Sequence, residues 1–294
     1  MELEEPLRLP YFRDPSELPA PLPTLAEIHA ATDGGSAWKK KACINNQFFV
    51  KYGVCTRQTE AENLLFVEKN LKISAPKLYA AWREPDGSLY IIMEYLPGDP
   101  LKKLWPDLEE PQKALILWEL RQVVNQIRAL PGPKVFATVS GGLLTHDLIR
   151  TPYVGDPDHN RPFANEREFL MSFINNVKSD AKDNNRHSYI GDFFERELLS
   201  EFVKNEDKHI PTFTHADFHQ LNILVTEREG QKGYNISLID WEAAGWYPSY
   251  WEYVAAFLTV QWDDNDWGIR LGDAVDSWPS ETTMMKMIHQ ILWF

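Results

Sequence analysis

The sequence is poor in cysteine and has no long hydrophobic run. Its 294 residues include two cysteines, Cys43 and Cys55. Two cysteines cannot form a disulfide framework, so a reducing compartment is expected. No stretch approaches the roughly 18 consecutive apolar residues of a membrane-spanning helix, and the N-terminus lacks the basic and apolar regions of a signal peptide. We therefore expect a cytoplasmic protein with no membrane partner.

Basic residues are also scarce, because 30 Lys and Arg face 43 Asp and Glu, a net charge of −13. Without a basic face, such a chain would repel a phosphodiester backbone, so nucleic acid is not an expected partner. The sequence has no Walker A motif, which argues against a P-loop enzyme. It is rich in aromatic residues, with 11 Trp, 11 Tyr and 15 Phe, which excludes a disordered chain.

The pattern of apolar residues changes near residue 97. Before it, aromatic and β-branched runs at 46–52 and 89–93 predict strands, and 59–67 predicts a helix between them. After it, apolar residues at steps of three and four predict amphipathic helices. These helical patterns cover 111–130, 169–177 and 193–203.

Two short strands, at 222–225 and 234–239, are predicted to form a hairpin within the helical part. The chain then divides into a proline-rich lead-in, a small strand-rich lobe and a large helical lobe that includes a loop. We place these segments at 1–25, 26–96 and 97–294, with the loop at 150–162.

Oxygen-bearing side chains gather around the predicted hairpin. Asp217 and Asn222 lie five residues apart before it, and Asp240 follows its second strand directly. A carboxylate that leaves a buried strand is costly unless it is paired or metal-bound. Together the three residues would form a compact oxygen site for Mg²⁺ and a polyphosphate, as phosphoryl transfer requires.

These motifs resemble those of a known family. HADFHQLN (215–222) resembles the HxDxxxxN catalytic loop of the aminoglycoside phosphotransferase and choline kinase group, a branch of the protein-kinase-like fold. IDWEAAG (239–245) is similar to its metal-binding segment. Three further segments are similar to fungal members, namely FVKYG (49–53), the predicted helix at 59–67 and the run at 245–253. The resemblance spans about 45–260, with its motifs in the expected order.

The resemblance implies a role for each matching residue. Asp217 would be the catalytic base, and Asn222 and Asp240 would hold Mg²⁺. Lys51 would contact the α- and β-phosphates of ATP or GTP. Its ion-pair partner would be Glu62, with Glu60 as the alternative.

The resemblance also implies roles for the backbone and for neighbouring positions. His215 would brace the catalytic loop. The only candidate for a phosphate-covering turn is 33–36, which is not a GxGxxG motif. Ala216 stands where the family more often has Gly, and Gln220 where it more often has Pro. The hinge that meets adenine through its backbone would be formed by Met93, Glu94, Tyr95 and Leu96.

The sequence thus predicts a bilobal, protein-kinase-like α+β enzyme that transfers the γ-phosphoryl group of ATP or GTP to a hydroxyl of a small molecule. Carboxylates interleaved with indoles suit a cationic acceptor, such as an amine or an aminoglycoside-like compound. The alternative for residues 263–266 is a solvated helix cap or loop. The candidate substrate contacts are Glu252, Trp262, Asp263, Asp264, Asp266 and Trp267.

Two other interpretations use the same residues. His215, Asp217 and His219 alternate and could share a strand face, as in the two-His-one-carboxylate site of iron oxygenases. That interpretation leaves Lys51, Asn222 and Asp240 without a role. The chain could also be a kinase-like nucleotide-binding protein that has lost catalysis, although none of the motif residues is missing.

Overall fold

The computed structural model describes residues 2–36, 38–144, 146, 161–204, 207–230, 232–260, 262 and 265–293. They divide into two compact units. The sheet unit comprises Glu5–Glu119 and Gln220–Glu242, and the helical unit comprises Met1–Glu4, Leu120–His219 and Ala243–Phe294. The predicted loop at 150–162 lies almost entirely outside the described residues.

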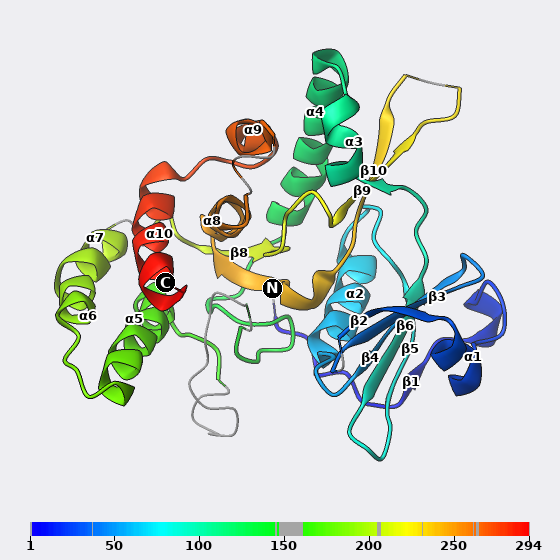
Figure 1. The fold of residues 1–294 in the computed structure, drawn as a ribbon, viewed down its shortest axis with the longest axis horizontal. Coiled ribbons are helices and arrows are strands. Elements are labelled where there is room, and N and C mark those ends of the chain that lie inside the picture. Colours follow the sequence, from blue (N-terminus) through cyan, green and yellow to red (C-terminus); the bar gives the residue numbers. More distant parts are fainter. Residues whose placement is uncertain are drawn as a thin grey trace. The chain divides into compact units, whose positions relative to one another are not determined.

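The sheet unit is built on a six-stranded antiparallel sheet (Figure 1). Its spatial order is β1-β5-β6-β4-β3-β2, so the two strands predicted from sequence, β4 and β6, are central neighbours. The strands are β1 (Tyr11–Phe12), β2 (Thr32–Gly35), β3 (Lys40–Ile44), β4 (Phe48–Gly53), β5 (Leu78–Arg83) and β6 (Leu89–Glu94).

Helices pack on both faces of this sheet. Val50 and Tyr52 point into an apolar cluster that includes Ile28 of α1 (Leu25–Ala30). Because side chains alternate along a strand, Lys51 points to the opposite face. There it meets α2 (Gln58–Asn70), the helix predicted at 59–67. Sheet geometry therefore places the Lys51 side chain on the face that α2 covers.

The N-terminal segment forms part of the sheet rather than an extended lead-in alone. Tyr11–Phe12 pairs with β5 as an edge strand, and the Phe12 ring stacks on Trp82 with centroids 6.1 Å apart. Pairing satisfies backbone groups that β5 would otherwise leave open. A short 3₁₀ helix, Pro15–Glu17, follows. The lobe boundaries at 25/26 and 96/97 stay predictions.

The predicted hairpin is confirmed, and it belongs to the sheet unit. β9 (Ile223–Glu227) and β10 (Tyr234–Leu238) pair in antiparallel register, and β7 (Asp99–Pro100) adds a third strand. Ser237 also forms a bridge to Ser74, which follows α2. The hairpin end that precedes Asp240 is thereby fixed within the same unit as Lys51. The remaining elements here are α3 (Leu101–Leu104) and the 3₁₀ helices Trp105–Asp107 and Trp241–Ala243, the last ending at the unit boundary.

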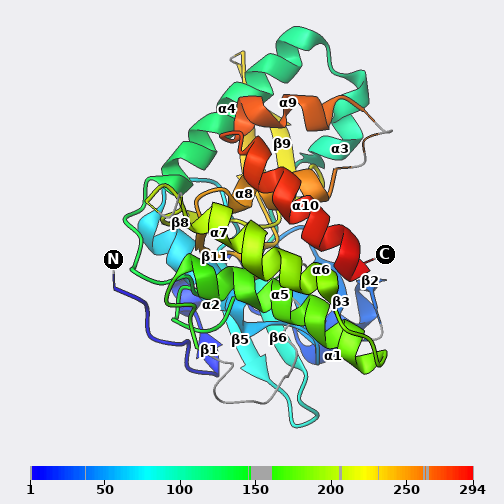
Figure 2. The same ribbon diagram turned by 90° about the vertical axis from the view of Figure 1, so that its left-hand side faces the viewer.

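The helical unit buries the apolar faces that the sequence periodicity predicts. Phe169, Leu170, Phe173, Ile174 and Val177 are all 3% exposed or less. Helices α5, α6, α7 and α10 lie side by side in Figures 1 and 2. The described helices are α4 (Glu110–Arg128, which begins in the sheet unit), α5 (Glu166–Asp183), α6 (Tyr189–Phe193), α7 (Leu199–Val203), α8 (Trp251–Leu258), α9 (Trp267–Ala274) and α10 (Pro279–Trp293).

Two further features complete this unit. A π-helical segment, Phe194–Leu198, joins α6 to α7 and makes the predicted helix at 193–203 nearly continuous. A two-stranded sheet pairs β8 (Pro211–Thr214) with β11 (Gly245–Pro248). β8 ends directly before the HADFHQLN loop, so this ribbon anchors the loop's start.

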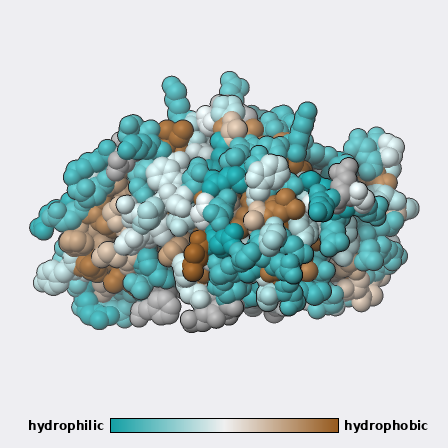
Figure 3. All heavy atoms as spheres, turned by 90° about the horizontal axis from the view of Figure 1, so that it is seen from above, coloured by the Kyte–Doolittle hydropathy of each residue, from teal (hydrophilic) through white to brown (hydrophobic). Residues whose placement is uncertain are grey.

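No helix in the described part of the chain is both long enough and apolar enough to cross a membrane. The face shown in Figure 3 is mostly hydrophilic, and its hydrophobic residues form separate small groups.

Candidate active site

Lys51 is held between two carboxylates in the sheet unit. Its Nζ lies 2.5 Å from Glu60 Oε1 on α2 and 2.8 Å from Asp240 Oδ1, which follows β10. The Lys51 side chain is 3% exposed. Burial lowers the pKa of Lys51, but the charges of Glu60 and Asp240 outweigh burial and raise that pKa above its usual range. The ammonium is therefore charged and fixed in direction, because a buried charge needs such partners.

Glu60, rather than Glu62, is the ion-pair partner of Lys51, which corrects the first assignment. Glu60 is buried on the helix face that meets the sheet, and burial raises its pKa to about 6 against the opposing charge of Lys51. Glu62 lies two residues, about 200°, further around the helix. Its Oε1 accepts hydrogen bonds from Leu7 N–H and Gln58 Nε2 at 3.1 and 3.0 Å.

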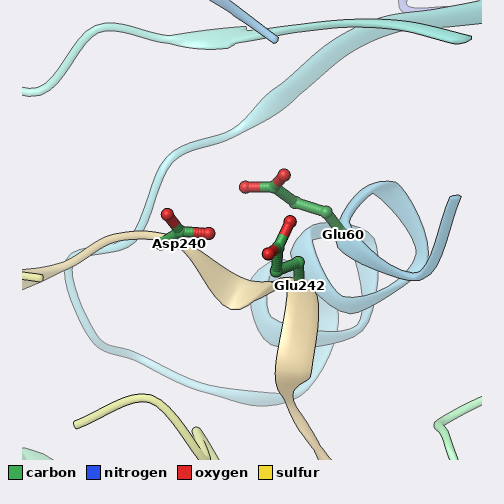
Figure 4. A group of neighbouring side chains, drawn as sticks. All are labelled: Glu60, Asp240 and Glu242. Atoms are coloured by element: carbon green, nitrogen blue, oxygen red, sulfur yellow. The ribbon is translucent and has the colours of Figure 1, made fainter. Parts of the chain in front are cut away.

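Asp240 and Glu242 complete a cluster of carboxylates with Glu60. One oxygen from each of the three lies within 4.8 Å of the others, and Figure 4 shows the three carboxylates turned toward one another. Burial opposes ionisation of Asp240, but the charges of Lys51, Lys39 and Lys41 outweigh it and lower its pKa to about 2. Ionised carboxylate oxygens in such a group fit Mg²⁺, which prefers hard oxygen ligands.

Glu242 was not among the predicted site residues. The signal was present, since it stands two residues after Asp240 in the same IDWE motif. It pairs with Lys39, which immediately precedes β3. The backbone carbonyl of Glu242 also accepts a hydrogen bond from Thr59 Oγ1 at 3.0 Å. Contacts with α2 and with the start of β3 therefore hold the segment after β10.

Asn222 lies at the same end of the hairpin as Asp240. Its carbonyl accepts a hydrogen bond of 3.0 Å from Ile239 N–H, the residue directly before Asp240. Asn222 is 6% exposed. Asp240 has a left-handed backbone, φ 65°, a conformation that Asp and Asn adopt more readily than most residues. The two predicted magnesium ligands are thus neighbours in the fold of the sheet unit.

The predicted hinge follows the central strand β6. Met93 and Glu94 close that strand, and Met93 is 2% exposed. Glu94 N–H donates to Lys77 O at 2.9 Å, and Tyr95 N–H donates to Gln47 O at 3.1 Å. The segment that ends at Leu96 is therefore anchored to the sheet by its backbone. An adenine-binding role for it stays a prediction.

The HADFHQLN segment, the predicted catalytic loop, begins in the helical unit. Asp217 is half-buried, and its Oδ1 lies 3.3 Å from His219 Nε2. Asp217 N–H donates to His215 Nδ1 at 3.3 Å, and His215 is fully buried. His215 therefore supports the loop from within, as expected. Residues 215–219 form no strand, so the strand face on which the iron-site interpretation depends is not present among these described residues.

A buried carboxylate and a histidine fix the peptide before Asp217. Glu252 of α8 accepts hydrogen bonds from His215 N–H at 2.7 Å and from Ala216 N–H at 3.0 Å. His146 Nε2 lies 2.6 Å from the carbonyl oxygen of Ala216 and donates to it. Ala216 has φ 65°, the left-handed conformation that favours the glycine more common in the family.

Glu252 is therefore not the substrate contact that the sequence suggested. It is 1% exposed, and its oxygens face the loop backbone. Burial raises its pKa to about 7, against the hydrogen bond from His215 and the charge of Arg128. Neither Glu252 nor His146 could be assigned this supporting role from sequence, because both contacts depend on tertiary packing.

The other candidate substrate contacts lie around α9 in the helical unit. Trp262 is 49% exposed and its ring meets Phe257 with centroids 4.9 Å apart. Asp266 occupies the N-cap position of α9. Trp267 is 4% exposed and contributes to the core rather than to an open surface. Asp263 and Asp264 lie outside the described residues.

A family model described as the phosphotransferase enzyme family matches residues 56–282, more than half of the chain. The chain belongs to this family. A sequence comparison with curated proteins finds no match.

Solved structures of aminoglycoside phosphotransferases resemble this member of the family. A thermostable mutant of APH(4)-Ia, in a ternary complex with ADP and hygromycin B, has a TM-score of 0.57 and 13% identity, covering 88% of this chain and 83% of that one. APH(2")-IIia with GDP and kanamycin has a TM-score of 0.52 and 13% identity, covering 89% and 76%. The predicted protein-kinase-like α+β fold, with a strand-rich lobe and a helical lobe, is confirmed.

Proposed function

We propose that the protein transfers the γ-phosphoryl group of ATP or GTP to a hydroxyl group of a small molecule. The observation that carries this proposal is the buried Lys51 between Glu60 and Asp240, with Glu242 beside them. A fixed ammonium next to ionised oxygen ligands is what a magnesium–nucleotide complex requires. Membership of the phosphotransferase family supports the same reaction.

In this proposal the sheet unit binds the nucleotide. Lys51 contacts the α- and β-phosphates, Asp240 and Asn222 ligate Mg²⁺, and the backbone at 93–96 meets the base. Bound Mg²⁺ neutralises the charge on the phosphates. ADP and AMP-PNP in complexes of APH(4)-Ia, and GDP in a complex of APH(2")-IIia, support a nucleotide ligand.

Asp217 acts on the acceptor. Its carboxylate accepts a hydrogen bond from the substrate hydroxyl and takes its proton as the hydroxyl oxygen bonds to the γ-phosphorus. The bond from that phosphorus to the β–γ bridging oxygen breaks, which releases the nucleoside diphosphate. His219 Nε2, 3.3 Å from Asp217 Oδ1, limits the directions that the carboxylate can take. Positioning and electrostatic stabilisation supply most of the rate enhancement.

The proposed acceptor is a cationic, hydroxylated small molecule. The net charge of −13 favours approach of a cation, and the half-exposed indole of Trp262 can bind one through cation–π attraction. Kanamycin and hygromycin B, present in complexes of the neighbours, support hydroxylated acceptors as a class.

Release of ADP or GDP is the test of this function. The full chain is incubated with Mg²⁺, ATP or GTP, and a panel of hydroxylated amines, sugars and aminoglycosides. Release that depends on one acceptor class supports transfer and identifies the substrate. Stabilisation of the fold by Mg·ATP without turnover on any acceptor would support the alternative, a nucleotide-binding protein without catalysis.

A further inference from the structure

Three consecutive lysines, Lys39, Lys40 and Lys41, lie at the start of β3. Side chains alternate there as the pleat requires. Lys39 Nζ pairs with Glu242, and Lys41 Nζ lies 3.9 Å from Asp240 Oδ2. Lys40 Nζ instead lies 5.7 Å from the centre of the Tyr52 ring. Tyr52 belongs to the apolar cluster that includes Ile28 of α1, so Lys40 lies on the opposite face of the sheet. Two of the three lysines therefore face the carboxylates that fit Mg²⁺.

Lys39 and Lys41 are more exposed to solvent than Lys51. Lys51 is 3% exposed and bonded on both sides, whereas the side chains of Lys39 and Lys41 are 23% and 42% exposed. A ligand can therefore reach the outer two ammonium groups from solvent. An ammonium group acts as a point charge toward phosphate and can change partners without a fixed geometry.

The turn before β3 is tight and holds Lys39 at its end. Ser36 N–H donates to Lys39 O at 2.6 Å, and Ser36 Oγ accepts from Lys39 N–H at 3.1 Å. Gly35 has φ 106°, and a Cβ there would lie 2.2 Å from Lys39 O. Only glycine fits this position. The turn predicted at 33–36 lies mostly within β2 (Thr32–Gly35), and the contacts of Gly35 and Ser36 with Lys39 fix the backbone beside the Lys39 side chain.

We propose that Lys39 and Lys41 bind the β- and γ-phosphates of the nucleotide and serve in place of the GxGxxG loop that the sequence lacks. This inference rests on the proposed function. Asp240, with Glu242 beside it, would share its negative charge with a bound Mg²⁺, and the ammonium groups of Lys39 and Lys41 would then be available to phosphate oxygens. In this proposal the terminal phosphates are bound by lysine side chains rather than by the backbone N–H groups of a glycine-rich loop.

The test compares Lys39→Gln and Lys41→Gln with Lys40→Gln, a matched control on the opposite face of the same strand. Affinities of the full chain for Mg·AMP-PNP, Mg·GMP-PNP and the corresponding nucleosides are measured by calorimetry. Lys39→Gln and Lys41→Gln should each bind the preferred triphosphate analogue at least about tenfold more weakly than the wild type, which is the equivalent of one charge-assisted contact. Their nucleoside affinities, and both affinities of Lys40→Gln, should equal those of the wild type.

The outcomes separate this inference from the function on which it depends. Equal triphosphate affinity in wild type, Lys39→Gln and Lys41→Gln would overturn the inference and leave the function intact. A wild type that binds neither Mg·AMP-PNP nor Mg·GMP-PNP would overturn both. Because Lys41 is 42% exposed and 3.9 Å from its partner, Lys41→Gln should fold normally, and retained nucleoside binding checks that it has.

Discussion

Glu252 Oε2 accepts a hydrogen bond of 2.7 Å from the backbone N–H of His215, two residues before Asp217. Its second oxygen accepts from Ala216 N–H. A fully buried carboxylate thus holds the loop that carries the proposed base, and burial raises its pKa to about 7 from an ordinary 4.5. The loop is therefore linked to a group that titrates near neutral pH.

This link makes stability depend on pH in a defined direction. The folded chain binds a proton at Glu252 between about pH 4.5 and 7, where the unfolded chain does not, so the free energy of unfolding rises as the pH falls through 7. Relative to Glu252→Gln, the wild type should gain on the order of 2 kcal/mol between pH 8 and pH 5. Urea unfolding of both proteins between pH 8 and pH 5 measures this gain. A difference in unfolding free energy that stays constant with pH would contradict the raised pKa of Glu252.

Glu60 and Glu62 offer a matched pair on one helix. Glu60→Gln removes the charge partner of the buried Lys51 and should lower the free energy of unfolding by about 2–4 kcal/mol. Glu62→Gln retains a hydrogen-bond acceptor for Leu7 and Gln58 and should cost less than about 1 kcal/mol. Chemical denaturation at pH 8 distinguishes them. Equal losses of unfolding free energy in the two variants would contradict a stabilising role for the ion pair between Lys51 and Glu60.

His146 is expected to affect turnover through the position of Asp217. His146→Ala removes the donor to the Ala216 carbonyl and should lower kcat by roughly tenfold while leaving the KM for nucleotide unchanged. His146→Gln, which retains an N–H donor, should recover part of the loss. Steady-state kinetics with the acceptor found by the panel provides the measurement. A folded His146→Ala protein with wild-type kcat would rule out this positioning role.

Ala216 has a backbone conformation that costs an L-residue roughly 1 kcal/mol relative to glycine. Ala216→Gly relieves that cost but removes a buried methyl group, so its free energy of unfolding should match or exceed the wild type by up to about 1 kcal/mol. Ala216→Val should lose at least about 2 kcal/mol, because a β-branched residue fits neither the left-handed backbone nor the packed site. Denaturant unfolding of the three proteins decides, and a more stable valine variant would refute the account.

Elements with strong local signals could be predicted from the sequence. The apolar periodicity of α4 and α5 and the runs that became β4, β6 and the hairpin depend on nearby residues alone. β1, with two residues, has almost no local signal and forms because β5 offers it an open edge. The sequence also left Glu60 and Glu62 as alternative ion-pair partners of Lys51. Only the packing of α2 on the sheet shows that Glu60 is the partner.

The candidate site divides in the same way. Lys51 and Asp240 belong to motifs whose order along the chain could be recognised. In the structure, Lys51 Nζ lies 2.8 Å from Asp240 Oδ1. Glu252 lies in a run that could equally face substrate, and only burial against His215 N–H reveals its role. The contact of Lys39 with Glu242 joins residues more than 200 positions apart, so no local pattern contains it.

Transfer of the terminal phosphate to a hydroxyl is the central claim, and product analysis with Asp217→Asn tests it most directly. Mass spectrometry of the acceptor, after incubation with Mg²⁺ and the preferred nucleotide, should detect a phosphate ester with the wild type. Asp217→Asn should form it at least about a hundredfold more slowly, whereas Asp183→Asn, an exposed aspartate at the end of α5, should match the wild type. Equal ester formation by wild type and folded Asp217→Asn would contradict the mechanism, and no ester with any acceptor of the panel would contradict the function.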